Sequence, residues 1–207
     1  MSRGSALTTT SYAILGLLTV QPWSTYELTQ QMDRSLGRFW PRAQSKLYEE
    51  PKKLVEHGLA EASTERRGKR PRTVYSITEQ GREAMASWLR TPGDGPLVES
   101  EQLLKLFFAD AGTRADALAT LAAARGWARE RNTENLAVAR TYVAGKARFQ
   151  HRVAQTMLVG GFLTEFYALV DRWAEWAGTQ VERWPDDPSE AQPDQAALTD
   201  IVRKADW

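Results

Sequence analysis

Residues 42–89 read RAQSKLYEEPKKLVEHGLAEASTERRGKRPRTVYSITEQGREAMASWL, and the order of patterns in this stretch decides the fold. Apolar side chains recur on one face over about 42–57, which predicts an amphipathic helix. Gly58 follows at the position where a helix commonly ends in a left-handed cap. Pro51 lies inside the pattern and has no backbone N–H to donate, so we expect a kink or a restart there.

A β-hairpin with a basic tip is predicted next. Residues 59–67 and 73–77 have the composition of short strands, and 66–72 (RRGKRPR) has the glycine and proline of a turn. Thr78 is a suitable N-cap for a further helix that must stop before Pro92.

Two shorter helices precede this stretch. Residues 8–20 are largely apolar, with Thr8 to Thr10 as candidate N-caps, and Pro22 stops this helix. Ser24 or Thr25 can cap a second helix that runs to about residue 36, and Gly37 is expected to end it in a left-handed conformation. Three helices, a hairpin and a fourth helix within residues 8–91 predict a winged helix-turn-helix.

The rest of the chain is expected to be almost entirely helical. The segment TPGDGP (91–96) is a candidate domain boundary. Helices are predicted over about 99–111, 114–145 and 148–176, which gives a helical domain at 97–178. The acidic, proline-containing tail at 184–207 is expected to be irregular, with one or two helical turns at 198–204. The sequence therefore predicts a mostly α protein.

Composition excludes several classes of site. The 207 residues include no cysteine and only two histidines, so thiol chemistry and a histidine-rich metal site are not expected. We find no phosphate loop, dinucleotide fingerprint, nucleophile elbow or metalloprotease motif, and predict neither an enzyme nor a cofactor. Residues 1–91 hold 14 Lys and Arg against 9 Asp and Glu, whereas 92–207 hold 13 against 17. The basic first half is the candidate for meeting a polyanion.

No targeting segment is recognised. Residues 1–7 lack the apolar core of a secretory signal. The longest apolar run, 157–163, is much shorter than the ~20 residues of a membrane span. We therefore expect no membrane contact and a cytoplasmic location.

The winged helix carries the candidate DNA contacts. The polar face of the third helix can donate to phosphates and base edges in the major groove, and cations on a tight hairpin can reach phosphates or the minor groove. A tyrosine on the second helix is a further candidate. The predicted DNA-binding residues are Tyr26, Arg42, Gln44, Ser45, Lys46, Tyr48, Lys52, Arg67, Lys69, Arg70 and Arg72.

At these residues the sequence resembles the PadR family of bacterial transcriptional regulators. The resemblance rests on TSYAILGLL (10–18), STYEL (24–28), SKLYEEPKKLVEHGLAE (45–61) and GKRPRTVYSITEQGREAMASWL (68–89). The C-terminal helices are similar in content and position to those of the longer PadR subgroup. Many relatives have proline directly after the tyrosine that matches Tyr48, whereas Pro51 lies three residues after it here.

The resemblance implies a dimeric repressor that binds double-stranded DNA and is often released by a phenolic acid or a hydrophobic drug. It also implies that Ser45, Lys46 and Tyr48 face DNA, that Lys69, Arg70 and Arg72 form the wing tip, and that Tyr75, Thr78 and Gly81 are structural. A symmetric dimer would read an inverted repeat.

Two sets of apolar residues in this chain are candidates for the dimer and for the effector. The dimer stripe is predicted to comprise Val159, Phe162, Leu163, Phe166, Val170 and Trp173. Trp23, Trp88 and Trp127 are candidates for an aromatic pocket that takes a planar effector. Such residues also pack in cores, and that alternative stays open for all of them.

A protein-interaction module is the rival function, because winged helices can also bind proteins. The hairpin discriminates between the two, since five cations within residues 66–72 suit phosphates and have no evident use in a protein-binding wing.

Overall fold

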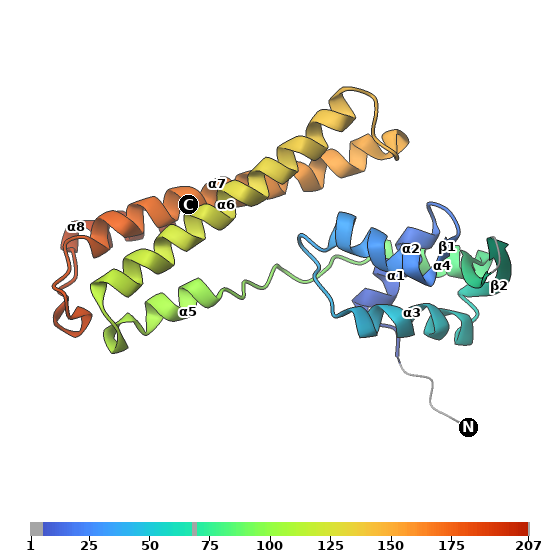
Figure 1. Ribbon diagram of the computed structural model, residues 1–207, viewed down its shortest axis with the longest axis horizontal. Helices are drawn as coiled ribbons and strands as arrows, with labels where there is room; N and C mark the ends of the chain where they lie inside the picture. The colour runs from blue at the N-terminus through green and yellow to red at the C-terminus, as the bar shows by residue number, and fades with distance from the viewer. Residues whose placement is uncertain (1–5, 68–69, 207) are drawn as a thin grey trace. The chain divides into compact units, whose positions relative to one another are not determined.

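The computed structural model describes residues 6–67 and 70–206 and divides into two compact units, Met1–Pro96 and Leu97–Trp207 (Figure 1). The first is the winged-helix unit and the second the helical unit, and each is described by itself. The predicted fold class, a winged helix with a β-hairpin followed by further helices, is confirmed.

The winged-helix unit begins with α1 (Thr9–Leu18). Thr8 and Ser11 cap it reciprocally: the Thr8 hydroxyl accepts from the Ser11 backbone N–H, and the Ser11 hydroxyl accepts from that of Thr8. Ile14, Leu15 and Leu18 of this helix are buried. The predicted start at Thr8 to Thr10 is thus confirmed.

A short strand that the sequence did not reveal, β1 (Trp23–Ser24), precedes α2 (Thr25–Gln31). Ser24 caps α2, as predicted, and one turn of π-helix continues it over Met32–Leu36. The expected left-handed Gly37 is wrong, because its φ is −57°. Glycine is needed here because there is no room for a side chain: a Cβ on Gly37 would lie 2.7 Å from the Asp33 carbonyl oxygen.

The third helix, α3 (Gln44–Glu56), runs without a break through Pro51, so the expected restart is wrong. Pro51 is fully buried, and packing around it holds the helix despite the missing backbone donor. Gly58, with φ of +70°, provides the predicted left-handed cap.

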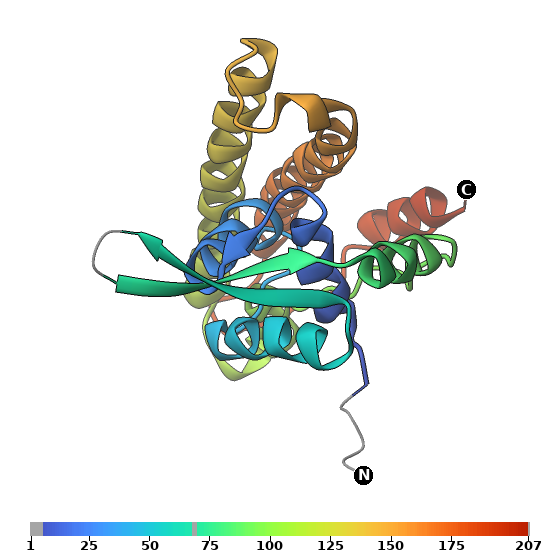
Figure 2. The same ribbon diagram turned by 90° about the vertical axis from the view of Figure 1, so that its right-hand side faces the viewer.

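The sheet has the strand order β1-β3-β2 and is antiparallel throughout. Strands β2 (Ala60–Arg67) and β3 (Arg70–Ile77) form a hairpin that extends away from the helices of its unit (Figure 2). Pro71 was expected in the turn but lies in β3, opposite Arg66. It is tolerated there because β1 pairs only with residues 74 and 75, so β3 has one neighbouring strand at position 71.

The hairpin is fastened to the fourth helix, α4 (Glu79–Leu89), at one junction. The Thr78 hydroxyl accepts from the backbone N–H of Gly81 and donates to the carbonyl of Gly58 at 2.7 Å. A Cβ on Gly81 would lie 2.1 Å from the Leu59 carbonyl oxygen, so only glycine fits there. The structural role predicted for Thr78 and Gly81 is therefore confirmed.

The helical unit consists mainly of two long helices that lie side by side, α6 (Arg114–Val143) and α7 (Val153–Val181) (Figures 1 and 2). A shorter helix, α5 (Glu101–Phe107), packs on α6 and is followed by a 3₁₀ turn at Ala109–Ala111. A second 3₁₀ turn, Gln150–Arg152, leads into α7. The predicted long helices are present, with shifted ends.

Small side chains form much of the contact between α6 and α7. The buried cluster consists of Ala117, Leu121, Ala124, Ala174 and Val181. Ion pairs border it, since Asp171 binds both Arg125 and Arg129. These residues hold the two helices together as one hairpin.

The expectation of an irregular tail is wrong in part, because residues 195–205 form α8 (Gln195–Ala205), capped by Asp194. The segment before it is docked onto the start of α6. Arg114 donates to the Trp184 carbonyl at 3.1 Å and pairs with Asp186 at 2.6 Å, and Pro188 is buried. Backbone and side-chain contacts thus order a stretch whose composition indicates disorder.

Gln150–Val181 is long and apolar enough to cross a membrane, judged by length and composition alone. Its most apolar 18 residues have a mean hydropathy of 1.4, and 11% of them are buried. The unbroken apolar runs in this segment are short, but its mean hydropathy is high because many of the residues between the large apolar side chains are small, such as glycine, or weakly polar, such as threonine. This helix therefore presents an extensive apolar surface.

Candidate nucleic-acid interface

The third helix separates its buried and exposed positions cleanly. Leu47, Glu50, Pro51 and Leu54 are buried at the spacing of one helix face. The outward positions with described side chains are Ser45, Lys46, Tyr48, Glu49, Lys52 and Glu56. The structure therefore brings four of the predicted contacts, Ser45, Lys46, Tyr48 and Lys52, onto one helix.

A buried carboxylate, which sequence reasoning missed, fixes α3 against α1. The Ser11 hydroxyl donates to a Glu50 carboxylate oxygen at 2.5 Å, and Lys53 pairs with the other oxygen at 3.3 Å. Ser11 is fully buried and Glu50 is 6% exposed. A hint was available, because a glutamate falls on the apolar face between Leu47 and Leu54.

Two predicted contacts lie beside α3. Arg42 precedes the helix, and its guanidinium group lies 4.1 Å above the centre of the Trp40 ring. It also donates to the Pro41 carbonyl at 2.6 Å. Tyr26 on α2 is 63% exposed, and its hydroxyl accepts from Gln30. Both predicted contacts are accessible from solvent.

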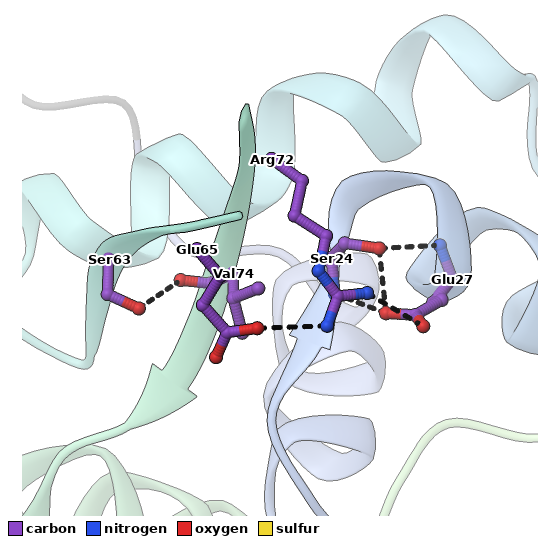
Figure 3. A network of polar contacts seen from close by, with 6 residues as sticks. All are labelled: Ser24, Glu27, Ser63, Glu65, Arg72 and Val74. Carbon is purple, nitrogen blue, oxygen red and sulfur yellow. Dashed lines mark hydrogen bonds and ion pairs between the residues drawn. The ribbon is translucent and has the colours of Figure 1, made fainter. Parts of the chain in front are cut away.

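Arg72 in the hairpin is held by two carboxylates (Figure 3). Its guanidinium group pairs with Glu65 on β2 at 2.9 Å and with Glu27 on α2 at 3.2 Å. Glu27 also accepts from the backbone N–H and the hydroxyl of Ser24. Hydrogen bonds from Ser24 and the charge of Arg72 hold the pKa of Glu27 below its usual value. The bond to Glu65 raises the pKa of Arg72 further.

Several predicted contacts cannot be placed. Lys69 lies outside the described residues, as do the side chains of Gln44, Arg67 and Arg70. Arg66, the first of the five cations within residues 66–72, is exposed. The register pairs Arg66 with Pro71 and Glu65 with Arg72, so Arg66 and Arg72 lie on opposite faces of the hairpin.

The predicted dimer stripe divides between two environments. Leu163 is buried within the unit, and Val170 and Trp173 pack against the α6–α7 cluster, so these three serve the chain's own core. For these three residues the core alternative that the sequence leaves open applies, because the apolar pattern on α7 is too broad for one contact. Val159 and Phe162 remain 40% and 58% exposed. Phe166 stacks on Phe162 and meets the edge of Trp127.

The three candidate effector tryptophans have different surroundings. Trp23 is 2% exposed and donates to the Leu17 carbonyl at 2.9 Å, so core packing accounts for it and the pocket prediction does not hold there. Trp88 stacks on Tyr12 with ring centres 5.1 Å apart. Trp127 is 39% exposed and contacts Phe166 and Tyr167. In the part of the chain that the structure describes, no group of three or more His, Cys, Asp or Glu could hold a metal ion.

The chain is similar to known regulators in both sequence and structure. Residues 14–87 match the model of the transcriptional regulator PadR-like family. The negative transcriptional regulator PadR of Bacillus subtilis is 34% identical over 108 residues, which are 51% of this chain and 59% of that protein. The chain therefore covers less than two thirds of this curated relative in the sequence comparison.

Structural similarity extends further along the chain. The crystal structure of Bacillus subtilis PadR in complex with operator DNA superposes with a TM-score of 0.74 at 25% identity, covering 84% of this chain and 99% of that one. The structure of the same protein in complex with p-coumaric acid gives a TM-score of 0.67 at 24% identity, covering 85% and 100%. Both units of this chain therefore share the arrangement of elements found in that protein.

Proposed function

The chain belongs to the PadR-like family of transcriptional regulators, and from this premise we propose that it represses transcription as a homodimer bound to an inverted-repeat operator. The proposal includes a cytoplasmic location, where the chain would meet bacterial DNA. Like its relatives, it is a transcriptional regulator and not an enzyme.

The separation of buried and exposed positions on α3 carries the DNA-binding proposal. Leu47, Glu50 and Leu54 anchor the helix, and the side chains of Lys46 and Tyr48 are exposed on its outward side. An anchored helix with outward donors is what reading base edges in the major groove requires. The hairpin follows in the position of a wing, with the exposed Arg66 as a phosphate contact.

The dimer proposal rests on the apolar surface of α7. Met157, Leu158, Phe162 and Leu169 are each more than half exposed. They recur at helical spacing along the side of α7 that α6 does not cover. A Cβ added to Gly161 would meet nothing within 4 Å, so the backbone is open to close approach there. A contiguous apolar patch of this kind marks a protein interface, and a second copy of α7 supplies a matching surface through twofold symmetry.

A charge on this surface tests the dimer. Phe162→Glu should give the mass of one chain by light scattering, whereas the unaltered protein gives that of two. Thr179→Glu is the matched control, since Thr179 is an exposed polar residue on the same helix. A monomeric unaltered protein, or dimeric Phe162→Glu, would exclude this interface, and vesicle binding by the unaltered protein would instead assign α7 to a membrane.

Operator binding is tested by fluorescence anisotropy with the DNA upstream of the chain's own gene, against scrambled DNA and across a salt series. Lys46→Ala should weaken binding and reduce the slope of log K against log salt by about one if Lys46 meets a phosphate. Glu49→Ala, at an adjacent exposed position, is the charge control and should not weaken binding. Equal, weak binding to both DNAs would favour the protein-interaction module.

We also propose a planar aromatic acid as effector. Bacillus subtilis PadR has been crystallised with p-coumaric acid, and Trp127 offers a partly exposed indole within an aromatic cluster of the helical unit. Such a ligand should release the DNA and quench tryptophan fluorescence, and Trp127→Leu should lose both responses while still binding DNA. Release that is unchanged in Trp127→Leu would place the effector elsewhere.

A further inference from the structure

We propose that Arg72 is a positioning residue that clamps the wing to α2 through Glu27 and Glu65, and that it does not donate to DNA phosphates. This inference rests on the proposed function and revises the role that the sequence suggests for this arginine. It makes the angle of the wing a property of a three-residue network (Figure 3).

The guanidinium group of Arg72 forms ion pairs on two sides. One terminal nitrogen faces Glu65, directly across the ladder on β2, and the other faces Glu27 on α2. Arg72 and Val74 are two residues apart on β3 and so project from the same face of the hairpin, the face on which Arg72 reaches Glu27 of α2. The Arg72 side chain is 31% exposed, whereas Arg66 belongs to the exposed residues.

The charges of the network argue against phosphate contact. One guanidinium and two carboxylates carry a net charge of −1, so these three side chains together offer no positive charge to a polyanion. A phosphate could pair with the guanidinium group of Arg72 only by displacing the carboxylates of Glu27 and Glu65. The network therefore suits a structural role better than a DNA contact.

Glu27 links the clamp to the helix-turn-helix itself. The same carboxylate accepts from the Ser24 backbone N–H at 2.9 Å, as the second half of the α2 capping box. Ser24 also pairs with Val74 in the sheet. The start of α2 and the middle of β3 are thus held together by one side chain, and the position of the wing follows that of α2.

Amide hydrogen exchange on the free protein tests the clamp without DNA. Arg72→Gln, Glu27→Gln and Glu65→Gln should each speed exchange in residues 62–66 and 72–75 by about two- to fivefold, the size expected for partly exposed ion pairs. Glutamine at position 27 still completes a capping box, so α2 should remain folded. Glu61→Gln is the control: it removes a negative charge from β2, the strand of Glu65, at a position that pairs with Ser76 and not with Arg72. It should leave exchange unchanged.

DNA binding then separates positioning from contact. Arg72→Gln and Arg72→Lys should weaken binding without reducing the salt slope, because lysine keeps the charge but cannot bridge two carboxylates with a planar group. Glu27→Gln should also weaken binding, although losing a negative charge favours a polyanion.

Two results would overturn the inference. One is tighter DNA binding by Glu27→Gln, which would mean that the carboxylate restrains a cation needed by DNA. The other is unchanged hairpin exchange together with a salt slope reduced by about one in Arg72→Gln. If the unaltered protein binds no DNA, the regulator proposal fails, and the exchange experiment still decides whether the clamp exists.

Discussion

The two units bury very different side chains, although they have similar lengths. The winged-helix unit encloses Trp23, Leu28, Met32 and Leu54 almost completely. In the helical unit, alanines make up half of the buried apolar residues, and Leu158 is 70% exposed. The first unit closes a core with its own large side chains, whereas the second buries some of its large apolar groups, such as Leu163 and Tyr167, and leaves others, such as Leu158 and Phe162, exposed.

This difference distinguishes a unit that is stabilised by its own core from one that would gain stability by binding a second copy. Apolar area removed from water within one chain stabilises that chain at any concentration, but area buried against a second copy stabilises it only when the copy is present. We therefore expect the stability of the winged-helix unit to be intrinsic and that of the helical unit to depend on protein concentration.

The largest expected effect is in the core of the winged-helix unit. Trp23→Ala removes a fully enclosed indole and should cost about 3–5 kcal/mol in the free energy of unfolding. Native-state hydrogen exchange at the amides of β3 measures the loss. Trp127→Ala, in the helical unit, should cost far less because Trp127 is already 39% exposed. Equal losses would break the contrast between the units.

Ser11→Ala addresses the polar contact inside the same core. It leaves the buried Glu50 carboxylate without its 2.5 Å hydrogen bond and should cost about 1–3 kcal/mol. Thr9→Ala, at an exposed position in the same turn, is the control. Urea unfolding followed by circular dichroism gives both values, and a neutral Ser11→Ala would show that Lys53 alone satisfies the carboxylate.

Leu158→Ser tests the exposed side of the contrast. In the separated chain the change should lie within about 0.5 kcal/mol, as for other surface substitutions. At high concentration the unaltered protein should have the higher Tm, because only it gains from dimerisation. Calorimetry over a wide concentration range measures this, and a Tm that is independent of concentration in the unaltered protein would contradict the expected dependence.

The smallest expected effect concerns pH. Burial by itself would raise the pKa of Asp171, but hydrogen bonds from Arg129 and Arg125 outweigh it, and the pKa lies below its usual 3.8. Ionised Asp171 therefore stabilises the helical unit at neutral pH, and this contribution is lost as pH falls through the lowered pKa. Asp171→Asn should be less stable at neutral pH and should converge with the unaltered protein in strong acid. A difference that is constant with pH would assign the effect to packing.

The sequence predicts what depends on local rules. Thr8, Ser24 and Thr78 cap the helices as expected, because an N-cap needs only a side-chain oxygen three residues before its partner. Gly58 is similar, since a left-handed turn after an apolar stripe is a local signal. The order of elements, and with it the fold, follows from such signals.

Long-range contacts could not be predicted in the same way. The two-residue strand β1 exists only because β3 lies beside it, and Glu27 meets Arg72 across 45 positions of sequence. On α7 one apolar pattern includes both residues packed against α6 and exposed residues, and periodicity alone does not distinguish them. Local patterns could not reveal the ion pairs of Arg72 or the burial of Leu163, because their partners are distant in sequence.

The arrangement of α3 has a consequence for how such proteins diversify. The positions that fold this helix, 47, 50, 51 and 54, do not overlap with the outward positions 45, 46, 48, 49 and 52. Surface substitutions generally change stability by less than about 0.5 kcal/mol. Under the proposed function, exchange of the outward residues would change the DNA sequence that is recognised, while the buried positions would preserve the same scaffold.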